Sequence, residues 1–415
     1  MKQQRRFGYA AAILSIGALV MPPVRDLFRE AGIRWGYMLL LSFCTAFFLT
    51  PMCARLARFL GVLDAPDARK SHSAATPLLG GVAVFIAFLA AIAANGIYSA
   101  RLGAILGAAA LVFGVGLWDD VRESPVLFKL AAQMIGTAWV AASGVVLSIV
   151  PDALGLFADG ANILLTFLWI IGITNAMNFF DGMDGLAAGL GAIIAFFLGV
   201  TAFQAHQPFL GWIAAAMMGA CLGFLPHNFK TGGRASIFLG DGGSTVIGFV
   251  LACLAVYGDW VPGNPLAAFI TPLLIFWLLI FDMVHITLDR IITGKVKGFH
   301  DWLAYVGRDH LHHRMADLLG KRRESVLFIY LLSLCFGAGA VALRNAGALE
   351  ALALLMQAVF LVGLITILER RGRGLAGSSL EAKRITETAV EEQRRGVIWS
   401  DSAVCNPERT APPDR

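Results

Sequence analysis

Charged residues are scarce in this chain. Asp, Glu, Lys and Arg make up 15% of its 415 residues, whereas 58% come from the set AVILMFWYC. Soluble domains carry about 25% charged residues, so this composition excludes a soluble globular protein. The apolar residues form long runs between short polar connections, and a membrane-spanning helix needs about 20 such residues. The sequence therefore predicts a polytopic membrane protein.

Cysteine is also rare, and its spacing shows no close pairing. The first five cysteines lie in or beside apolar stretches, where cysteine behaves as a small hydrophobic residue. This pattern excludes a disulfide framework and a cysteine-based zinc motif. The six cysteines are Cys44, Cys53, Cys221, Cys253, Cys335 and Cys405.

The alternation of apolar and polar positions that marks a transmembrane β-barrel is missing as well. Runs such as 102–118 and 269–281 are apolar on every side. We therefore expect an all-α polytopic bundle of about 11–12 transmembrane helices. The candidate spans are residues 7–22, 35–53, 79–99, 102–118, 128–149, 161–180, 186–205, 208–225, 243–259, 266–285, 326–343 and 348–368.

No internal repeat and no Gly/Ser linker divides the apolar region, which predicts one membrane domain over 35–368. Residues 1–34 form an extra N-terminal anchor and linker. The first span follows basic residues, as a signal peptide would, but Met21-Pro22-Pro23 is a poor cleavage site and favours an uncleaved anchor. Residues 369–415 are polar and mixed in charge, and we expect a disordered cytoplasmic tail there.

The distribution of Lys and Arg predicts the sidedness of the chain. With a cytoplasmic N-terminus, the inside segments before residue 369 hold nineteen of these residues and the outside segments hold five. The positive-inside rule favours this orientation. It also predicts that the ends of the chain's spans divide between a cytoplasmic and an outer side of the membrane.

Acidic residues at membrane edges are costly and mark functional sites. Those of this chain fall at span ends predicted to be cytoplasmic, although the topology uses only Lys and Arg. The adjacent carboxylates of Asp119 and Asp120 repel each other, so either one is protonated or a cation holds both, unless the pair is ordinary interfacial charge. The acids are Asp64, Asp67, Asp119, Asp120, Asp181, Asp184 and Asp241.

The segment 175–185 combines two carboxamides, Asn175 and Asn178, with two carboxylates, Asp181 and Asp184. In a continuous helix the last carboxylate would turn to the opposite side from the first carboxamide. Gly182 and Gly185 allow a break that turns both carboxylates into one polar site. We therefore predict a helix break here.

Two further segments contain groups suited to phosphates. Asp241 lies in a glycine-rich turn that opens a span, where a helix N-terminus favours anions and a carboxylate can hold a divalent ion. The longest inside loop carries a cluster of histidines with an arginine, which favours a pyrophosphate over zinc because no cysteine lies nearby. This cluster is His310, His312, His313 and Arg314, and a second cationic cluster includes Lys70 and His72.

Acids that hold a divalent ion, beside cations for phosphates, indicate phosphoryl transfer from a soluble donor to a membrane acceptor. A nucleotide-sugar transporter or a polyprenyl-lipid flippase shares many of these parts. A carrier needs polar residues at the bilayer midplane, however, and these acids lie at inner span ends. A lipid-pyrophosphate hydrolase, with water as the acceptor, is a further alternative.

Five motifs, in order along 35–368, resemble those of the polyprenyl-phosphate N-acetylhexosamine-1-phosphate transferases. The histidine motif, His-x-His-His-Arg, looks like the branch that transfers N-acetylglucosamine 1-phosphate, which is related to the muramyl-pentapeptide phosphotransferases. The motifs are Arg69-Lys70-Ser-His72 with Thr76-Pro77 and Gly80-Gly81, Trp118-Asp119-Asp120, Asn175-x-x-Asn178-x-x-Asp181-Gly-x-Asp184-Gly, Phe238-x-Gly-Asp241-x-Gly-Ser244 and His310-x-His312-His313-Arg314.

The resemblance implies transfer of a sugar 1-phosphate from a UDP-N-acetylhexosamine to undecaprenyl phosphate, with release of UMP. It implies Mg²⁺, or Mn²⁺ in its place, as cofactor and synthesis of a cell-envelope polysaccharide as outcome. The partners expected are these two substrates and the lipid bilayer, and no nucleic acid. The sequence leaves open a homodimer, the identity of the hexosamine, and the choice between one-step attack and a covalent aspartyl-phosphate.

The resemblance also implies roles for individual residues. Those implied in catalysis are Asp119, Asp120, Asp181 and Asp184. Those implied in substrate binding are Lys70, His72, Asn175, Phe238, His310, His312, His313 and Arg314, with Phe238 stacked on uracil. Those implied in metal binding are Asn178 and Asp241.

Overall fold

The computed structural model describes residues 2–64, 75–96, 98–230, 233–298, 301, 307 and 309–369. The chain divides into two units, Met1–Phe360 and Leu361–Arg415. Of the second unit, residues 361–369 are described and are helical. The predicted disordered tail from residue 370, and the predicted substrate-binding residues Lys70 and His72, lie outside the described residues.

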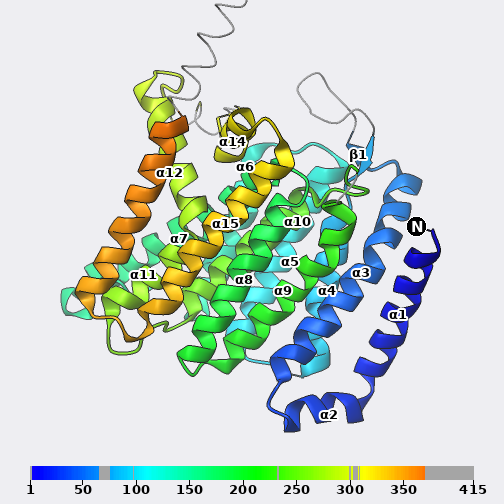
Figure 1. The fold of residues 1–415 in the computed structure, drawn as a ribbon. Helices are drawn as coiled ribbons and strands as arrows, with labels where there is room; N and C mark the ends of the chain where they lie inside the picture. The colour runs from blue at the N-terminus through cyan, green and yellow to red at the C-terminus, as the bar shows by residue number, and fades with distance from the viewer. Residues whose placement is uncertain are drawn as a thin grey trace, which may run out of the picture. The chain divides into compact units, whose positions relative to one another are not determined.

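The described chain is almost entirely helical, which confirms the predicted all-α bundle (Figure 1). Its α-helices are α1 Lys2–Val20, α2 Pro22–Glu30, α3 Arg34–Leu60, α4 Gly80–Asn95, α5 Ala100–Val121, α6 Val126–Ala142, α7 Leu156–Phe179, α8 Leu186–Gln204, α9 Pro208–Asn228, α10 Gly240–Tyr257, α11 Pro265–Ile275, α12 Trp277–Ile292, α14 Leu311–Leu319, α15 Arg322–Ala342 and a helix over Ala348–Glu369. The remaining elements are the 3₁₀ helices η1 Asp152–Leu154, η2 Phe180–Gly182 and η3 Leu343–Asn345, and an antiparallel pair of strands, β1 Leu63–Asp64 and β2 Thr76–Pro77.

Each candidate span coincides with a helix or a helix pair. By length and apolarity, eight helices of the described residues can cross a membrane alone, and two bent pairs raise the number to ten. The two other spans correspond to α4 and α6, which have only 16 and 17 residues. The chain is therefore a multi-pass membrane protein.

Three predicted spans are wrong in detail. Span 7–22 runs into α2, and the pair is bent by 75° at Met21 because Pro22 and Pro23 cannot continue α1. Span 266–285 is two helices, α11 and α12, bent by 77° at Phe276. Span 128–149 ends early, at Ala142.

The early end of α6 has a local cause. Gly144 adopts a left-handed φ of +85°, which stops the helix. The side chains of Asn162 and Thr166 on α7 then accept hydrogen bonds from the backbone N–H groups of residues 147, 149 and 150. These bonds replace the helical ones, which an irregular backbone near a membrane requires.

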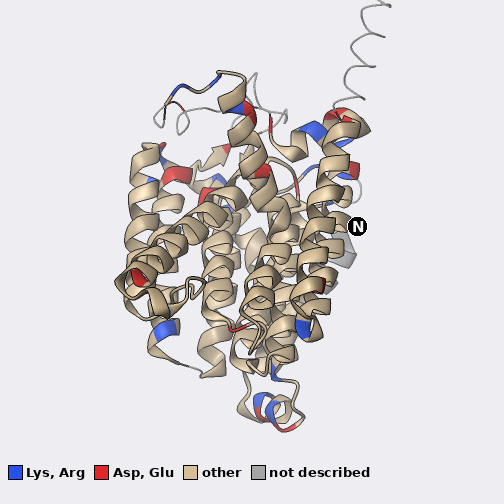
Figure 2. Cartoon of the chain, turned by 90° about the vertical axis from the view of Figure 1, so that its left-hand side faces the viewer, with Lys and Arg blue, Asp and Glu red and all other residues tan. Residues whose placement is uncertain are grey.

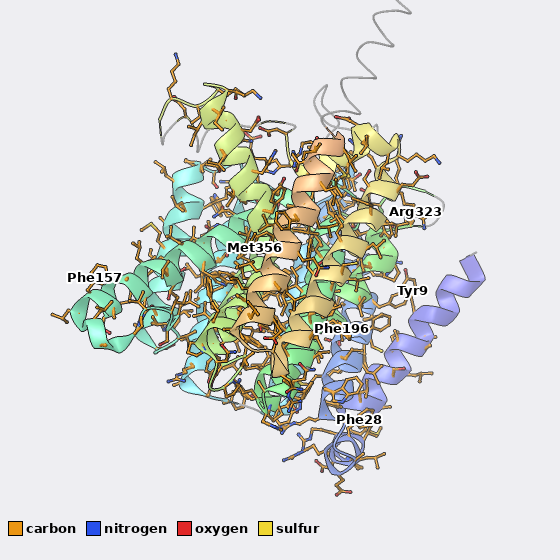
Figure 3. The ribbon with its side chains drawn as sticks, turned by 60° about the vertical axis from the view of Figure 1, so that its left-hand side comes forward. Tyr9, Phe28, Phe157, Phe196, Arg323 and Met356 are labelled. Carbon is orange, nitrogen blue, oxygen red and sulfur yellow. The ribbon has the colours of Figure 1, made fainter. Side chains whose placement is uncertain are left out.

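Charge and exposure fit this membrane setting. Figure 2 shows the charged residues mostly toward the two ends of the bundle, with few in its middle. Large apolar side chains point outward, including Phe157, Phe196 and Met356, which are 72%, 45% and 43% exposed (Figure 3). Such an apolar surface matches lipid rather than water.

Helix α10 lies at the centre and packs against α4, α5, α7 and α8. Its approach to two of these helices depends on glycine. A Cβ on Gly116 of α5 would lie 2.7 Å from Gly242 Cα, and one on Gly81 of α4 would lie 2.4 Å from Gly243 Cα. Any side chain would separate the backbones. The end of α5 is thereby held against the start of α10, and the acids of both meet.

Candidate active site

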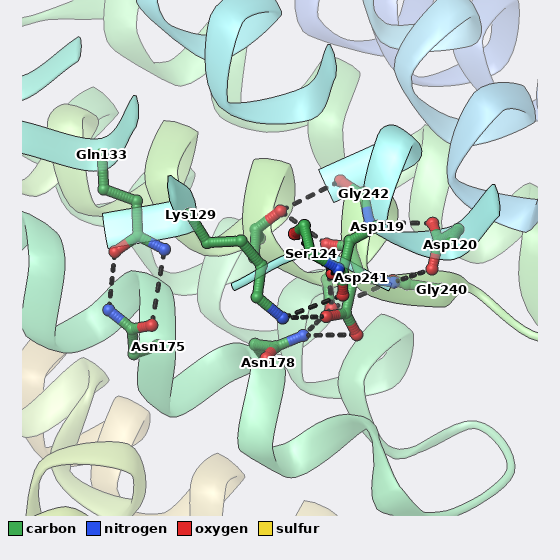
Figure 4. Close-up of polar contacts among 12 residues, drawn as sticks. Asp119, Asp120, Ser124, Lys129, Gln133, Asn175, Asn178, Gly240, Asp241 and Gly242 are labelled. Atoms are coloured by element: carbon green, nitrogen blue, oxygen red, sulfur yellow. Dashed lines mark hydrogen bonds and ion pairs between the residues drawn. The ribbon is translucent and has the colours of Figure 1, made fainter. Parts of the chain in front are cut away.

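Asp119 and Asp120 lie in the last turn of α5, but their side chains bind different partners (Figure 4). The Asp120 carboxylate accepts hydrogen bonds from the backbone N–H groups of Asp241, at 2.7 Å, and Gly242, at 3.1 Å. Both groups belong to the first turn of α10, where backbone amides have no partner within the helix. Asp120 therefore caps α10 from a neighbouring helix and places Asp241 beside α5.

The ammonium group of Lys129, on α6, lies between the carboxylates of Asp119 and Asp241. Its Nζ lies 2.9 Å from Asp119 Oδ2 and 2.9 Å from Asp241 Oδ2. The other oxygen of Asp119 accepts the Ser124 backbone N–H at 2.8 Å and its hydroxyl at 2.6 Å. The three charged side chains are only 15–33% exposed. Two carboxylates thus converge on one position that a cation occupies.

Asn178 and Asn175 lie on α7, but they serve different contacts. Asn178 Nδ2 donates to Asp241 Oδ1 at 3.1 Å and to Ser244 Oγ at 2.9 Å. Asn175 instead pairs its carboxamide with that of Gln133, at 2.7 Å and 3.4 Å. We call Asp119, Asp120 and Asp241 the acid cluster. Of the two predicted carboxamides, Asn178 contacts this cluster and Asn175 does not.

The predicted break after α7 is confirmed. The helix gives way to η2, Asp181 leaves helical geometry with ψ 23°, and Gly185 turns the chain with φ +84°. Asp184 Oδ2 accepts the backbone N–H of Ala235 at 2.9 Å, and Asn228 Oδ1 accepts that of Gly185. Asp181 is partly buried and lies within electrostatic range of Asp120, Asp184 and Asp241. The acid turn, which we define as 179–185, thus brings Asp181 near Asp120 and Asp241, while Asp184 ties the turn to Ala235.

The histidine motif forms the start of α14, with His310 as its N-cap residue. The His310 ring stacks on Phe179 at 5.0 Å, and the His312 ring lies 5.7 Å from that of Phe180. A Cβ on Gly182 would be 2.5 Å from His312 Nε2. The structure therefore packs His310 and His312 directly on the acid turn, and His313 lies against His312 with ring centroids 4.2 Å apart.

His312 is 1% exposed, and neither of its ring nitrogens has a hydrogen-bond partner among the described residues. Burial, reinforced by the neighbouring His313 and His310, lowers the pKa of His312 well below its ordinary value. The ring is therefore neutral near pH 7.

Phe238 lies just before α10, and its backbone pairs with β2 and α4. Its N–H donates to Pro77 O at 2.8 Å, and its carbonyl accepts the Gly80 N–H at 3.0 Å. The ring is partly exposed. Strand β2 thus fixes the loop that carries Phe238 next to Asp241.

Sequence reasoning missed three residues that contact the acid cluster or the segment 309–310: Lys129, Asp282 and Arg290. Lys129 counted only toward the charge balance, and Asp282 lies inside an apolar span. The signal was present, because an ionisable residue within a membrane helix indicates function by default.

Among the described residues no group of three or more His, Cys, Asp or Glu side chains is arranged to hold a metal ion.

Comparisons with known proteins agree with the motifs. Residues 102–259 match glycosyl transferase family 4. The chain is 32% identical over 321 residues to a probable undecaprenyl-phosphate N-acetylglucosaminyl 1-phosphate transferase of Bacillus subtilis, covering 76% of this chain and 87% of that protein. It is 31% identical over 388 residues to a decaprenyl-phosphate N-acetylglucosaminephosphotransferase of Mycobacterium tuberculosis, covering 84% and 92%. It is 26% identical over 286 residues to an undecaprenyl-phosphate alpha-N-acetylglucosaminyl 1-phosphate transferase of Escherichia coli O157:H7, covering 67% and 75%.

Proposed function

Because the chain belongs to glycosyl transferase family 4, among the polyprenyl-phosphate N-acetylglucosamine-1-phosphate transferases, we propose that it transfers N-acetylglucosamine 1-phosphate from UDP-N-acetylglucosamine to undecaprenyl phosphate. The observation that carries the proposal is the convergence of Asp119 and Asp241 on one cation position at the meeting point of α5, α6 and α10. The product would start a cell-envelope polysaccharide.

In the proposed reaction an oxygen of the lipid phosphate attacks the β-phosphorus of the donor. The new bond joins that oxygen to the β-phosphorus, and the bond from the β-phosphorus to the bridging oxygen breaks, so UMP leaves with the electron pair. A lipid phosphate monoanion must first lose a proton. We assign this role to Asp119, because its carboxylate borders the cation position beside Asp241, whereas that of Asp120 caps α10.

The residues present fit a divalent ion. Lys129 Nζ is a cation that two carboxylates already hold at 2.9 Å, and hard oxygen donors suit Mg²⁺. Asp241, with the carboxamide oxygen of Asn178, would hold the ion beside Asp119. When bound, it would neutralise negative charge on the diphosphate. Displaced from this position, the Lys129 ammonium would remain beside the phosphates as a second cation.

The histidine motif would face the donor. His310 and His312 pack on the acid turn, within one helix turn of Asn178, so a diphosphate held at the acid cluster would lie near their rings. We place the site at the cytoplasmic face of the inner membrane, since the Lys and Arg count favours that side for the ends of α5 and α7.

The test is a transfer assay with purified protein and a panel of UDP-N-acetylhexosamines. We expect UMP release and lipid-linked sugar only when undecaprenyl phosphate is present. Chelation should abolish both, and Mg²⁺ or Mn²⁺ should restore them. UMP release without the lipid would indicate the hydrolase, and uptake of intact UDP-sugar into vesicles without UMP would indicate the transporter.

A further inference from the structure

Asp282 is a fully buried carboxylate on α12 that contacts three residues of the histidine motif and its helix. Its Oδ2 lies 2.8 Å from His310 Nδ1, and its Oδ1 accepts the backbone N–H of Leu311 at 2.7 Å. Arg314 NH2 lies 3.7 Å from the same Oδ1. The side chain of Asp282 is 0% exposed. A buried charge is costly unless it is paired, and here one short helix supplies the pairing.

A second ion pair on α12 fixes the residue before the motif. Arg290, 6% exposed, donates to both oxygens of Asp309 at 2.8 Å. Burial raises the pKa of Asp309, but the hydrogen bonds from Arg290 outweigh it, and the pKa falls below its ordinary value. Asp309 is thus ionised near neutral pH, and the segment entering α14 is fastened at two consecutive residues.

The contact with Asp282 sets the chemistry of the His310 ring. A carboxylate only accepts hydrogen bonds, so Nδ1 must carry a proton. The ring then either leaves Nε2 as an acceptor or, once protonated, offers Nε2–H as a charged donor. Phe179 holds the ring plane against the acid turn, at 5.0 Å. Orientation and protonation of one histidine are therefore set from α12, outside the acid cluster.

We propose that Asp282 is a positioning residue that keeps His310 protonated on Nδ1, so that the imidazolium presents Nε2–H to the diphosphate of the donor. The ligand named in this inference rests on the proposed function, whereas the contact between Asp282 and His310 does not depend on it. A purely structural role fits less well, because a buried ion pair is often replaceable by apolar residues without loss of stability.

The pH dependence of donor binding follows from this role. An imidazolium donates from Nε2, whereas the neutral ring with its proton on Nδ1 does not. Affinity for the donor should therefore fall as pH rises. Among the described residues, three elements bring titratable or charged groups to His310 or Asp282. They are Asp282 itself from α12, Asp309 from the segment before α14, and His312 and Arg314 from α14.

Asp282→Asn separates geometry from protonation. Its amide oxygen can still accept the Leu311 N–H, so α14 stays anchored, but its NH₂ requires an unprotonated Nδ1. The neutral ring then carries its proton on Nε2. The neutral Nε2–H that remains is a weaker donor to an anion than an imidazolium, so we expect the donor KM at pH 6 to rise about tenfold and to depend less on pH than that of wild type. Asp289→Asn on the same helix, whose carboxylate is 32% exposed, is the matched control and should behave as wild type.

The second measurement reads the protonated nitrogen of the ring directly. Protein labelled with ¹⁵N-histidine reports which ring nitrogen carries the proton, and His310→Gln identifies the His310 signal. We expect Nδ1 protonated in wild type and Nε2 alone protonated in Asp282→Asn. A wild-type signal with Nε2 alone protonated would overturn the proposal, as would a KM profile for Asp282→Asn parallel to that of wild type. If the signals behave as expected but no donor supports transfer, the proposed function fails and the positioning contact stands.

Discussion

At the scale of single residues, Lys129 determines how the acid cluster tolerates its charge. Lys129→Met would leave Asp119 and Asp241 facing each other without a cation. We expect the free energy of unfolding in chelator to fall by about 1–2 kcal/mol. The loss stays this small because the three side chains are partly exposed, and solvent screens their charges. Added Mg²⁺ should then raise the Tm of the variant more than that of wild type. Thermal unfolding in detergent, with and without Mg²⁺, checks this.

The matched control is Lys295→Met, since Lys295 lies 3.8 Å from Asp289 and is 44% exposed. Its Tm should respond to Mg²⁺ as wild type does. Equal responses of the Lys129 variant and wild type would mean that the two carboxylates do not form a cation position.

Asp119 and Asp120 look equivalent in the sequence, but their contacts separate them. Asp119→Asn should lower kcat by about 10²-fold, the usual loss for a proton acceptor. Its amide oxygen can still accept both Ser124 bonds, so Tm should fall only by the loss of the partly exposed Lys129 contact. Asp120→Asn should lower Tm as well, because an amide has one acceptor oxygen for the two N–H groups of α10. Steady-state kinetics and thermal unfolding of both variants test the distinction. Identical Tm values would remove the capping role.

The buried His312 gives stability a pH dependence. Its folded pKa lies well below the unfolded value of about 6.5, so below that pH the unfolded chain binds a proton that the folded chain does not. Stability should therefore fall as the pH drops through 6.5, by up to about 1.4 kcal/mol per pH unit, until the folded pKa is reached. His312→Gln should lose this slope. Unfolding curves of the two proteins that stay parallel from pH 7 to 5 would contradict the assignment.

Much of the site could be predicted from residue types alone. Asp119, Asp120, Asp181, Asp184 and Asp241 interrupt apolar sequence, which is enough to single them out. Their partners could not be predicted, because Lys129 approaches Asp241 across 112 positions of sequence and Asp282 approaches His310 across 28. Such pairings depend on helix packing, which a single sequence does not specify.

At the scale of elements, Gly182 determines how closely α14 approaches the acid turn. A Cβ there would lie 2.5 Å from His312 Nε2, so one of the two segments must move. We expect Gly182→Ala to lower the free energy of unfolding by about 1–3 kcal/mol, as overpacking does. We also expect kcat/KM to fall at least about tenfold, because the displaced segment would misplace the residues of the site. Kinetics and thermal unfolding measure both.

Gly172→Ala is the matched control, because a Cβ at Gly172 of α7 meets nothing within 4 Å. It should leave activity unchanged and preserve or raise the Tm, since alanine is the better helix former. Full activity of Gly182→Ala would mean that the His312 contact plays no part in the reaction.

Element boundaries show what the sequence can and cannot predict. Gly182 and Gly185 predicted the break after α7, because glycine weakens a helix and the neighbouring carboxylates are costly inside a membrane span. The bend at Phe276 carries only a weaker signal, Pro272 four residues earlier, within an otherwise apolar stretch. Gly144 ends α6 early, but the backbone after it is held by hydrogen bonds donated to Asn162 and Thr166, which lie on another helix and cannot be assigned from local sequence.

At the scale of the whole molecule, apolar runs were sufficient to predict the bundle, since each candidate span has a helical counterpart. Sidedness is a separate prediction, because helices of either orientation pack equally well and only flanking charge distinguishes them. The proposed function depends on it, since a nucleotide donor is a cytoplasmic substrate. Sidedness can be measured with exposed residues at the two ends of the bundle.

Single cysteines at Glu123 and Arg234 should face the cytoplasm, and those at Tyr98 and Leu349, which are 75% and 78% exposed, should face outward. In a background without native cysteines, an impermeant maleimide should label the second pair in intact cells and the first pair only in inverted vesicles. Glu123 follows Asp119 and Asp120 by a few residues, so its label reports the side of the acid cluster itself. Labelling of both Glu123→Cys and Arg234→Cys in intact cells would place the acids on the side where no UDP-sugar is supplied, and the transferase proposal would fail with the topology.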